Sequence, residues 1–208
     1  MGPDVPHARR AGGGGVEAAA QQPPPSDIPP FIDATQLWPY TAGLQFIAAL
    51  EQLGGLDAVD AAFEDPPVST EQVIHPERYP NDLPVPVDVP DIAAELGGGW
   101  EDLDVQGVGE MWLDQALRLR LSDGEASDAA AGLDGGIYRA WSRGDDVAIV
   151  LATAWDTEAD AAAFAEAMGR WIGDSGQSAT VLPVEGSGVR VLFASDAGTL
   201  AALQGAEA

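Results

Sequence analysis

The chain of 208 residues contains no cysteine and no long apolar run. Without cysteine, the protein can form no disulfide, thiolate nucleophile, thiolate zinc site or cysteine-linked lipid anchor. A membrane-spanning helix needs roughly 20 consecutive apolar residues, and no stretch of the chain approaches this length. The sequence therefore predicts no transmembrane segment, while the lack of cysteine leaves the redox compartment open.

Positive charge is also scarce. The chain has no lysine, and its nine arginines oppose 34 aspartates and glutamates, which gives a formal net charge of -25. At physiological ionic strength the Debye length is about 8 Å and so many carboxylates repel one another, whereas molar salt shortens this length to about 3 Å. The balance favours a halophilic protein, with an acidic protein of ordinary surroundings as the alternative. It argues against nucleic acid and anionic membranes as partners, because both bind basic patches, and suits cationic partners better.

The first 33 residues differ in composition from the rest. They are rich in Gly, Pro and Gln and cannot bury enough apolar surface to order themselves, so we predict a disordered tail or linker over residues 1–33. The pair Arg9-Arg10 superficially resembles a twin-arginine export signal, but no hydrophobic segment follows it. A flexible tail explains the same residues, and a fragment or a misassigned start would explain a missing signal.

Residues 34–208 are predicted to form a single α+β domain. In its helical part, about residues 34–132, apolar spacing predicts a helix up to Gly54-Gly55 and a shorter helix through Phe63. In its sheet-containing part, about residues 133–208, the pattern predicts a hairpin, a helix, a second hairpin and a short helix. This order is typical of an antiparallel sheet covered by helices.

The segment from Pro66 to Tyr79 carries the strongest local signals. Ser69 and Gln72 have the spacing of a capping box, and Pro76 limits the helix that they open to about one turn. Residues 83–90 then alternate apolar side chains with prolines. We expect this stretch to be extended along an edge or the surface, because proline is excluded from central strands.

His75 is the most chemically versatile residue of the predicted domain. On a helix it would share a face with Glu71, four residues earlier, and Glu77, Arg78 and Tyr79 follow closely. A carboxylate beside an imidazole can orient a base or supply two arms of a metal site. The alternative is that both side chains fix the following turn, which we favour because catalytic zinc needs three protein ligands and the other histidine lies in the tail. The sequence thus predicts binding residues at these five positions, and no catalytic residue, metal or cofactor.

The same segment resembles part of a known family. Residues 66–79 resemble the signature PPxSTEQILHPEKY of uncharacterised proteins from bacteria and salt-loving archaea, and Gly109-Glu110 with residues 132–138 and 154–161 resemble its later blocks. The resemblance covers about residues 34–170. It departs at residues 132–138, which lack the Trp and the Asp-Arg pair of the family's GWGGDRY block.

The resemblance implies a cell-surface protein of salt-loving organisms and a likeness to the C-terminal region of gluzincin-like metallopeptidases. Some relatives carry an upstream zinc core with a His-Glu-x-x-His motif, which this chain lacks. We therefore expect a non-catalytic, salt-adapted domain of a surface-associated or exported protein that binds a protein or cell-envelope partner through its helical part. The alternative is an accessory or degenerate region of a zinc metallopeptidase, in which Glu71 and His75 line a substrate cleft without binding zinc.

Overall fold

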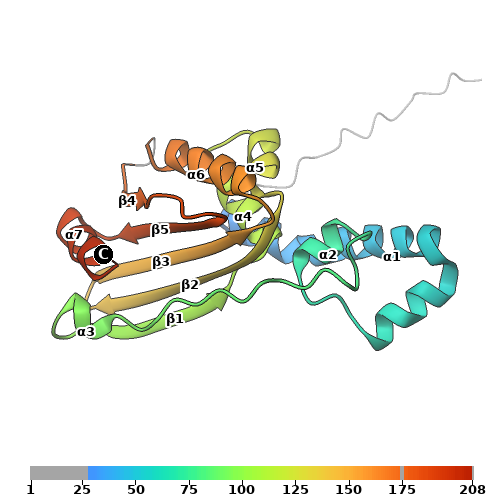
Figure 1. The fold of residues 1–208 in the computed structure, drawn as a ribbon, viewed down its shortest axis with the longest axis horizontal. Coiled ribbons are helices and arrows are strands. Elements are labelled where there is room, and N and C mark those ends of the chain that lie inside the picture. The colour runs from blue at the N-terminus through green and yellow to red at the C-terminus, as the bar shows by residue number, and fades with distance from the viewer. Residues whose placement is uncertain (1–27, 174–175, 208) are drawn as a thin grey trace, which may run out of the picture.

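The computed structural model describes residues 28–173 and 176–207 (Figure 1). Within these residues it has seven helices and one five-stranded sheet. The helices are α1 (Pro30–Glu64), α2 (Thr70–Ile74), α3 (Ala93–Leu96), α4 (Glu110–Leu117), α5 (Asp123–Ala130), α6 (Glu158–Gly173) and α7 (Ala197–Ala206). The strands are β1 (Glu101–Gly107), β2 (Leu133–Arg143), β3 (Asp146–Trp155), β4 (Ser178–Val181) and β5 (Gly188–Ala194).

The sheet is antiparallel throughout, in the order β1-β2-β3-β5-β4. β2 and β3 form the long central hairpin, which turns at Gly144 with φ of +62°. β5 pairs with both β3 and β4. β3 and β5 are therefore neighbours in the sheet, although α6 and β4 lie between them in the sequence. The α+β fold class with an antiparallel sheet is therefore confirmed.

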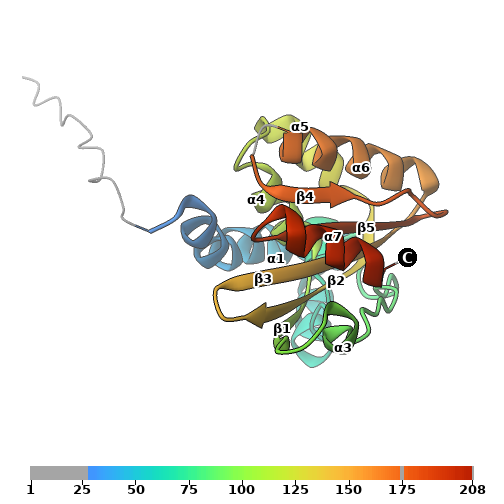
Figure 2. The same ribbon diagram turned by 90° about the vertical axis from the view of Figure 1, so that its left-hand side faces the viewer.

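Helices cover both faces of this sheet (Figure 2). Because side chains alternate along a strand, β3 contributes Leu151 and Trp155 to one core and Val150 and Ala152 to the other. The first core packs against α4, α5 and α6, and includes the fully buried Phe164. The second core lies beneath α3 and α7. The sheet thus has a buried layer on each face, and the segment before β1 contributes Leu96 and Trp100 to the second one.

α1 extends away from the sheet together with α2 (Figure 1). It begins at Pro30, within the predicted tail, and bends at Gly55, where φ is +70°. Phe46 and Leu50 anchor it in a small third core that includes Tyr79. Residues 1–27 of the predicted tail, including the arginine pair, lie outside the described residues.

The segment between α2 and α3 crosses from this helical region onto the sheet. It forms no regular element, but Val85 N donates to Asp134 O at 2.8 Å, and Val89 is buried in the second core. The approach depends on Gly135, since a Cβ there would lie 2.1 Å from Val85 O. Over residues 28–173 and 176–207, no helix is long and apolar enough to cross a membrane.

Candidate functional site

The predicted site residues lie on and just after α2, where the helical region meets the sheet. Ser69 caps this helix by accepting a hydrogen bond from Gln72 N at 3.1 Å. The Gln72 side chain is buried, accepts from Val68 N at 2.8 Å and donates to Asp82 O at 2.7 Å. The capping residues therefore also fix the loop that follows the helix.

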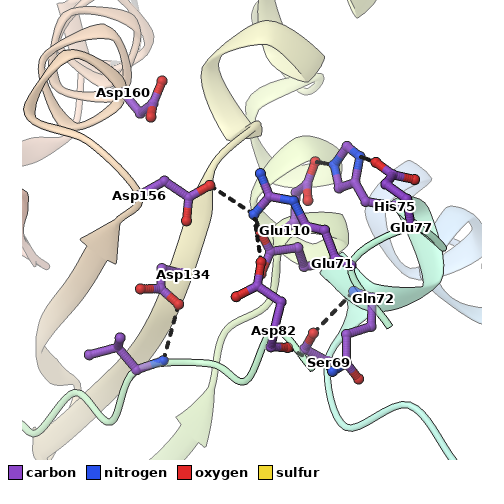
Figure 3. A network of polar contacts seen from close by, with 12 residues as sticks. Ser69, Glu71, Gln72, His75, Glu77, Asp82, Glu110, Asp134, Asp156 and Asp160 are labelled. Atoms are coloured by element: carbon purple, nitrogen blue, oxygen red, sulfur yellow. Dashed lines mark hydrogen bonds and ion pairs between the residues drawn. The ribbon is translucent and has the colours of Figure 1, made fainter. Parts of the chain in front are cut away.

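Arg78 is the cation at the centre of this loop. Its Nη1 contacts the carboxylates of Glu71, Asp82 at 3.2 Å and Asp156 at 2.8 Å. The Glu71 side chain is only 5% exposed, whereas that of Asp82 is 43% exposed. Asp156 follows β3, so one guanidinium joins the loop to the sheet (Figure 3).

His75 makes a second link, to the first residue of α4. Its Nε2 lies 3.2 Å from Glu110 Oε1, and its Nδ1 lies 3.8 Å from the exposed Glu77. The approach of α4 depends on Gly109, because a Cβ there would lie 2.4 Å from Thr70 Oγ1. Figure 3 shows the imidazole between the two glutamates. We call the side chains of Glu71, His75, Arg78, Asp82, Glu110 and Asp156 the ionic cluster.

Burial alters the proton affinity of the cluster. It raises the pKa of Glu71 to about 7 from 4.5, although Arg78 opposes the shift. Burial also raises the pKa of Glu110, against the opposing effect of His75. Glu71 can therefore exchange a proton near neutral pH, as catalytic acids and bases do, but structural ion pairs show the same property.

A cavity of about 440 Å³ opens beside the cluster. Glu71 and Glu110 line it, together with Asp134 of β2. Apolar side chains complete its walls. They come from the residue before the α2 cap, from the crossing segment, and from the sheet and the residue that follows β1: Val68, Val85, Val87, Val108, Leu133 and Ile137. The cavity thus combines an acidic side with an apolar side.

The five predicted residues do not all reach this cavity. Glu71 lines it, while His75 and Arg78 contact the glutamates around it. Glu77 has a side chain that is 67% exposed. Tyr79 points the other way, donating its hydroxyl to Asp65 O and packing edge-on against Phe46. The proposed binding role of these residues remains a prediction.

Sequence reasoning missed Glu110, Asp134 and Asp156 as members of the site. Each lies far along the chain from His75 and joins the site only through the fold. A signal was present, because all three fall in the blocks that resemble the uncharacterised family. In the part of the chain that the structure describes, no three His, Asp or Glu side chains are arranged to hold a metal ion.

The fold and the site define an α+β domain with a helical extension joined to it by polar contacts of Arg78 and His75. Residues 101–204 match the family described as Domain of unknown function (DUF8575), and the chain belongs to this family. The match begins at β1 and ends within α7, so it includes all five strands of the sheet. We found no match among curated proteins and none among solved structures.

Proposed function

We propose that this chain is a non-catalytic, salt-adapted domain of a cell-surface protein, and that it binds a protein partner through α1. The surface location comes from the sequence resemblance alone. The binding role is supported by one structural observation, the apolar surface of the helical region. Salt adaptation is supported by the charge balance.

Apolar exposure is concentrated in the helical region. Of the sixteen large apolar side chains that are exposed among the described residues, twelve lie between Ile28 and Val85. Four lie within the family domain, although it is the larger part: Leu103, Val105, Leu119 and Val184. Contiguous exposed apolar surface on one element marks an interaction site more often than scattered residues do.

The exposed side chains of α1 form a stripe. Leu37, Tyr40 and Leu44 are 57%, 75% and 75% exposed, and their i, i+3, i+7 spacing places them on one face. Phe46 and Leu50 lie on the opposite face and are buried. A helix that is apolar on both faces needs a partner on each, and this spacing is the one by which helices dock into apolar grooves.

The stripe can be tested with matched variants. The triple variant L37S/Y40S/L44S removes it, whereas L103S/V105S/L119S removes three exposed apolar side chains, of smaller exposed area, from the family domain. We expect envelope extract in about 2 M KCl to yield a partner that binds the wild type and the second variant but not the first. Recovery of no partner, or equal loss with both variants, would contradict the proposal.

Salt adaptation has a separate test. Over residues 28–173 and 176–207, six arginines form ion pairs with ten carboxylates, so repulsion among the other acidic side chains depends on dissolved ions. Screening should then stabilise the fold, and we expect the melting temperature to rise markedly between dilute buffer and about 2 M KCl. Equal melting temperatures would favour the alternative of an ordinary acidic protein.

A second candidate function is an accessory region of a zinc metallopeptidase. It is favoured by the cavity beside Glu71 and Glu110, which has the size of a small-molecule site. In this case the isolated chain should hold no zinc and cleave no peptide, but adding it to the separate zinc core should change that core's activity. An unchanged activity would count against this candidate.

A further inference from the structure

We propose that the acidic cavity is a binding site for a small organic ammonium ion. The ligand would present N–H donors to Glu71, Glu110 and Asp134 and place its hydrocarbon part against the apolar wall. This site is separate from the α1 stripe, so either proposal can fail without the other.

One buried carboxylate oxygen, Oε2 of Glu110, has no hydrogen-bond donor among the described residues. Glu110 is only 6% exposed, and its Oε1 is taken by His75. Over residues 28–173 and 176–207, no hydrogen-bond donor reaches its Oε2. Burial deprives this oxygen of the hydrogen bonds that it would make in water, which costs free energy, so Oε2 is a candidate acceptor for a ligand N–H group.

Carboxylates around the cavity outnumber the cations that contact them. The ionic cluster and Asp134 together hold five carboxylates, and among the described residues Arg78 is the one permanent cation within contact distance of them. Arg78 reaches Glu71, Asp82 and Asp156, while the Asp134 side chain accepts from Val85 N at 3.3 Å. Burial raises the pKa of Asp134, as it does for both glutamates. A ligand cation would stabilise the ionised forms, so its binding should release protons.

The size of the cavity and its apolar wall suit a small organic cation. The cavity of about 440 Å³ falls in the range of small-molecule sites, and Val87 and Ile137 offer it an apolar surface. A bare metal ion would gain nothing from that surface. A primary ammonium on a short hydrocarbon chain matches both sides, since its three donors can reach more than one carboxylate.

The probe is n-butylammonium, titrated into the full chain in about 2 M KCl at about pH 8 and followed by amide NMR. We expect saturable shifts centred on Gly109, Gly135 and Gly136. Neutral n-butanol should bind much more weakly, because it lacks the charge. Tetramethylammonium should also bind weakly, because it has charge but no N–H donor.

Variants locate the ligand. Glu110→Gln and Asp134→Asn should each lower the affinity for n-butylammonium by about tenfold or more, since each removes a carboxylate that accepts from the ligand. Asp145→Asn, in the turn at the far end of the central hairpin, is the matched control and should change nothing. Glu110 also lines a second cavity of about 410 Å³ with Asp114, so Asp114→Asn tests that neighbour.

Three results would overturn the proposal: no saturable binding, equal binding of n-butanol, or weakening by Asp114→Asn but not by Asp134→Asn. Amide spectra of each variant without ligand establish whether it is folded. If Glu110→Gln unfolds, Asp134→Asn alone decides, because the Asp134 side chain makes a single long hydrogen bond at 3.3 Å.

Discussion

Replacing Glu71 by glutamine should change the pH dependence of stability. The pKa of Glu71 is about 7 in the folded protein against 4.5 for the free group, so the folded state holds the proton more tightly. The contribution of Glu71 to the free energy of unfolding is therefore full below pH 4.5 and is lost as pH rises through about 7. Between about pH 5 and about pH 8 the loss amounts to about 2.5 kcal/mol. The amide introduced by Glu71→Gln cannot ionise, so the variant should gain that amount relative to wild type over this interval.

The assay is urea unfolding followed by tryptophan fluorescence, at each pH and in constant salt. The exposed Glu95 serves as the control, because Glu95→Gln removes the same charge from the surface of α3. A difference between wild type and Glu71→Gln that stays constant with pH would refute the reasoning. It would mean that Arg78 stabilises the ionised carboxylate enough to cancel the effect of burial.

Two further predictions concern packing around the site. Gly135→Ala should destabilise the fold by about 1–3 kcal/mol, because the new methyl group would meet Val85 O, whereas Gly124→Ala, in open space on α5, should stabilise it slightly. Urea unfolding of both variants separates the strain at Gly135 from the general effect of replacing glycine by alanine. Equal effects of the two substitutions would contradict the close approach of Val85 O to Gly135. Tyr79→Phe should cost about 1 kcal/mol by removing the hydrogen bond to Asp65 O, and Tyr79→Ala about 3 kcal/mol or more by also removing the ring. If the Phe variant were as unstable as the Ala variant, the hydroxyl would matter more than the packing.

Local chemistry explains which elements could be predicted. The cap at Ser69 forms as expected and opens α2, because Ser69 and Gln72 lie within one helical turn. The bend at Gly55 follows equally from a residue that tolerates positive φ. β1 was missed. Its residues are acidic and mostly exposed, and it pairs with one neighbour only, so tertiary pairing rather than intrinsic propensity makes it a strand.

The site shows where helical periodicity fails. Placing Glu71 and His75 on one face assumes a helix through both, but α2 ends at Ile74, and His75 has φ of -117° and ψ of 75°. That turn directs the imidazole to Glu110, while Glu71 pairs with Arg78. Glu71, His75 and Arg78 lie in one cluster, but their partners come from elements that only the fold brings close.

The cluster also explains how two differently built regions hold together in so acidic a chain. The contacts of Arg78 with Asp156 and of His75 with Glu110 cross from the helical region to the family domain. Dissolved ions screen exposed carboxylates but reach buried pairs far less. The side chains of Arg78 and Asp156 are 30% and 28% exposed, whereas that of Glu110 is only 7% exposed. Salt should therefore relieve repulsion over the surface and weaken the contact of Arg78 with Asp156 more than that of His75 with Glu110. The proposed binding role of the α1 stripe requires that this second contact keep the helical region docked in concentrated salt.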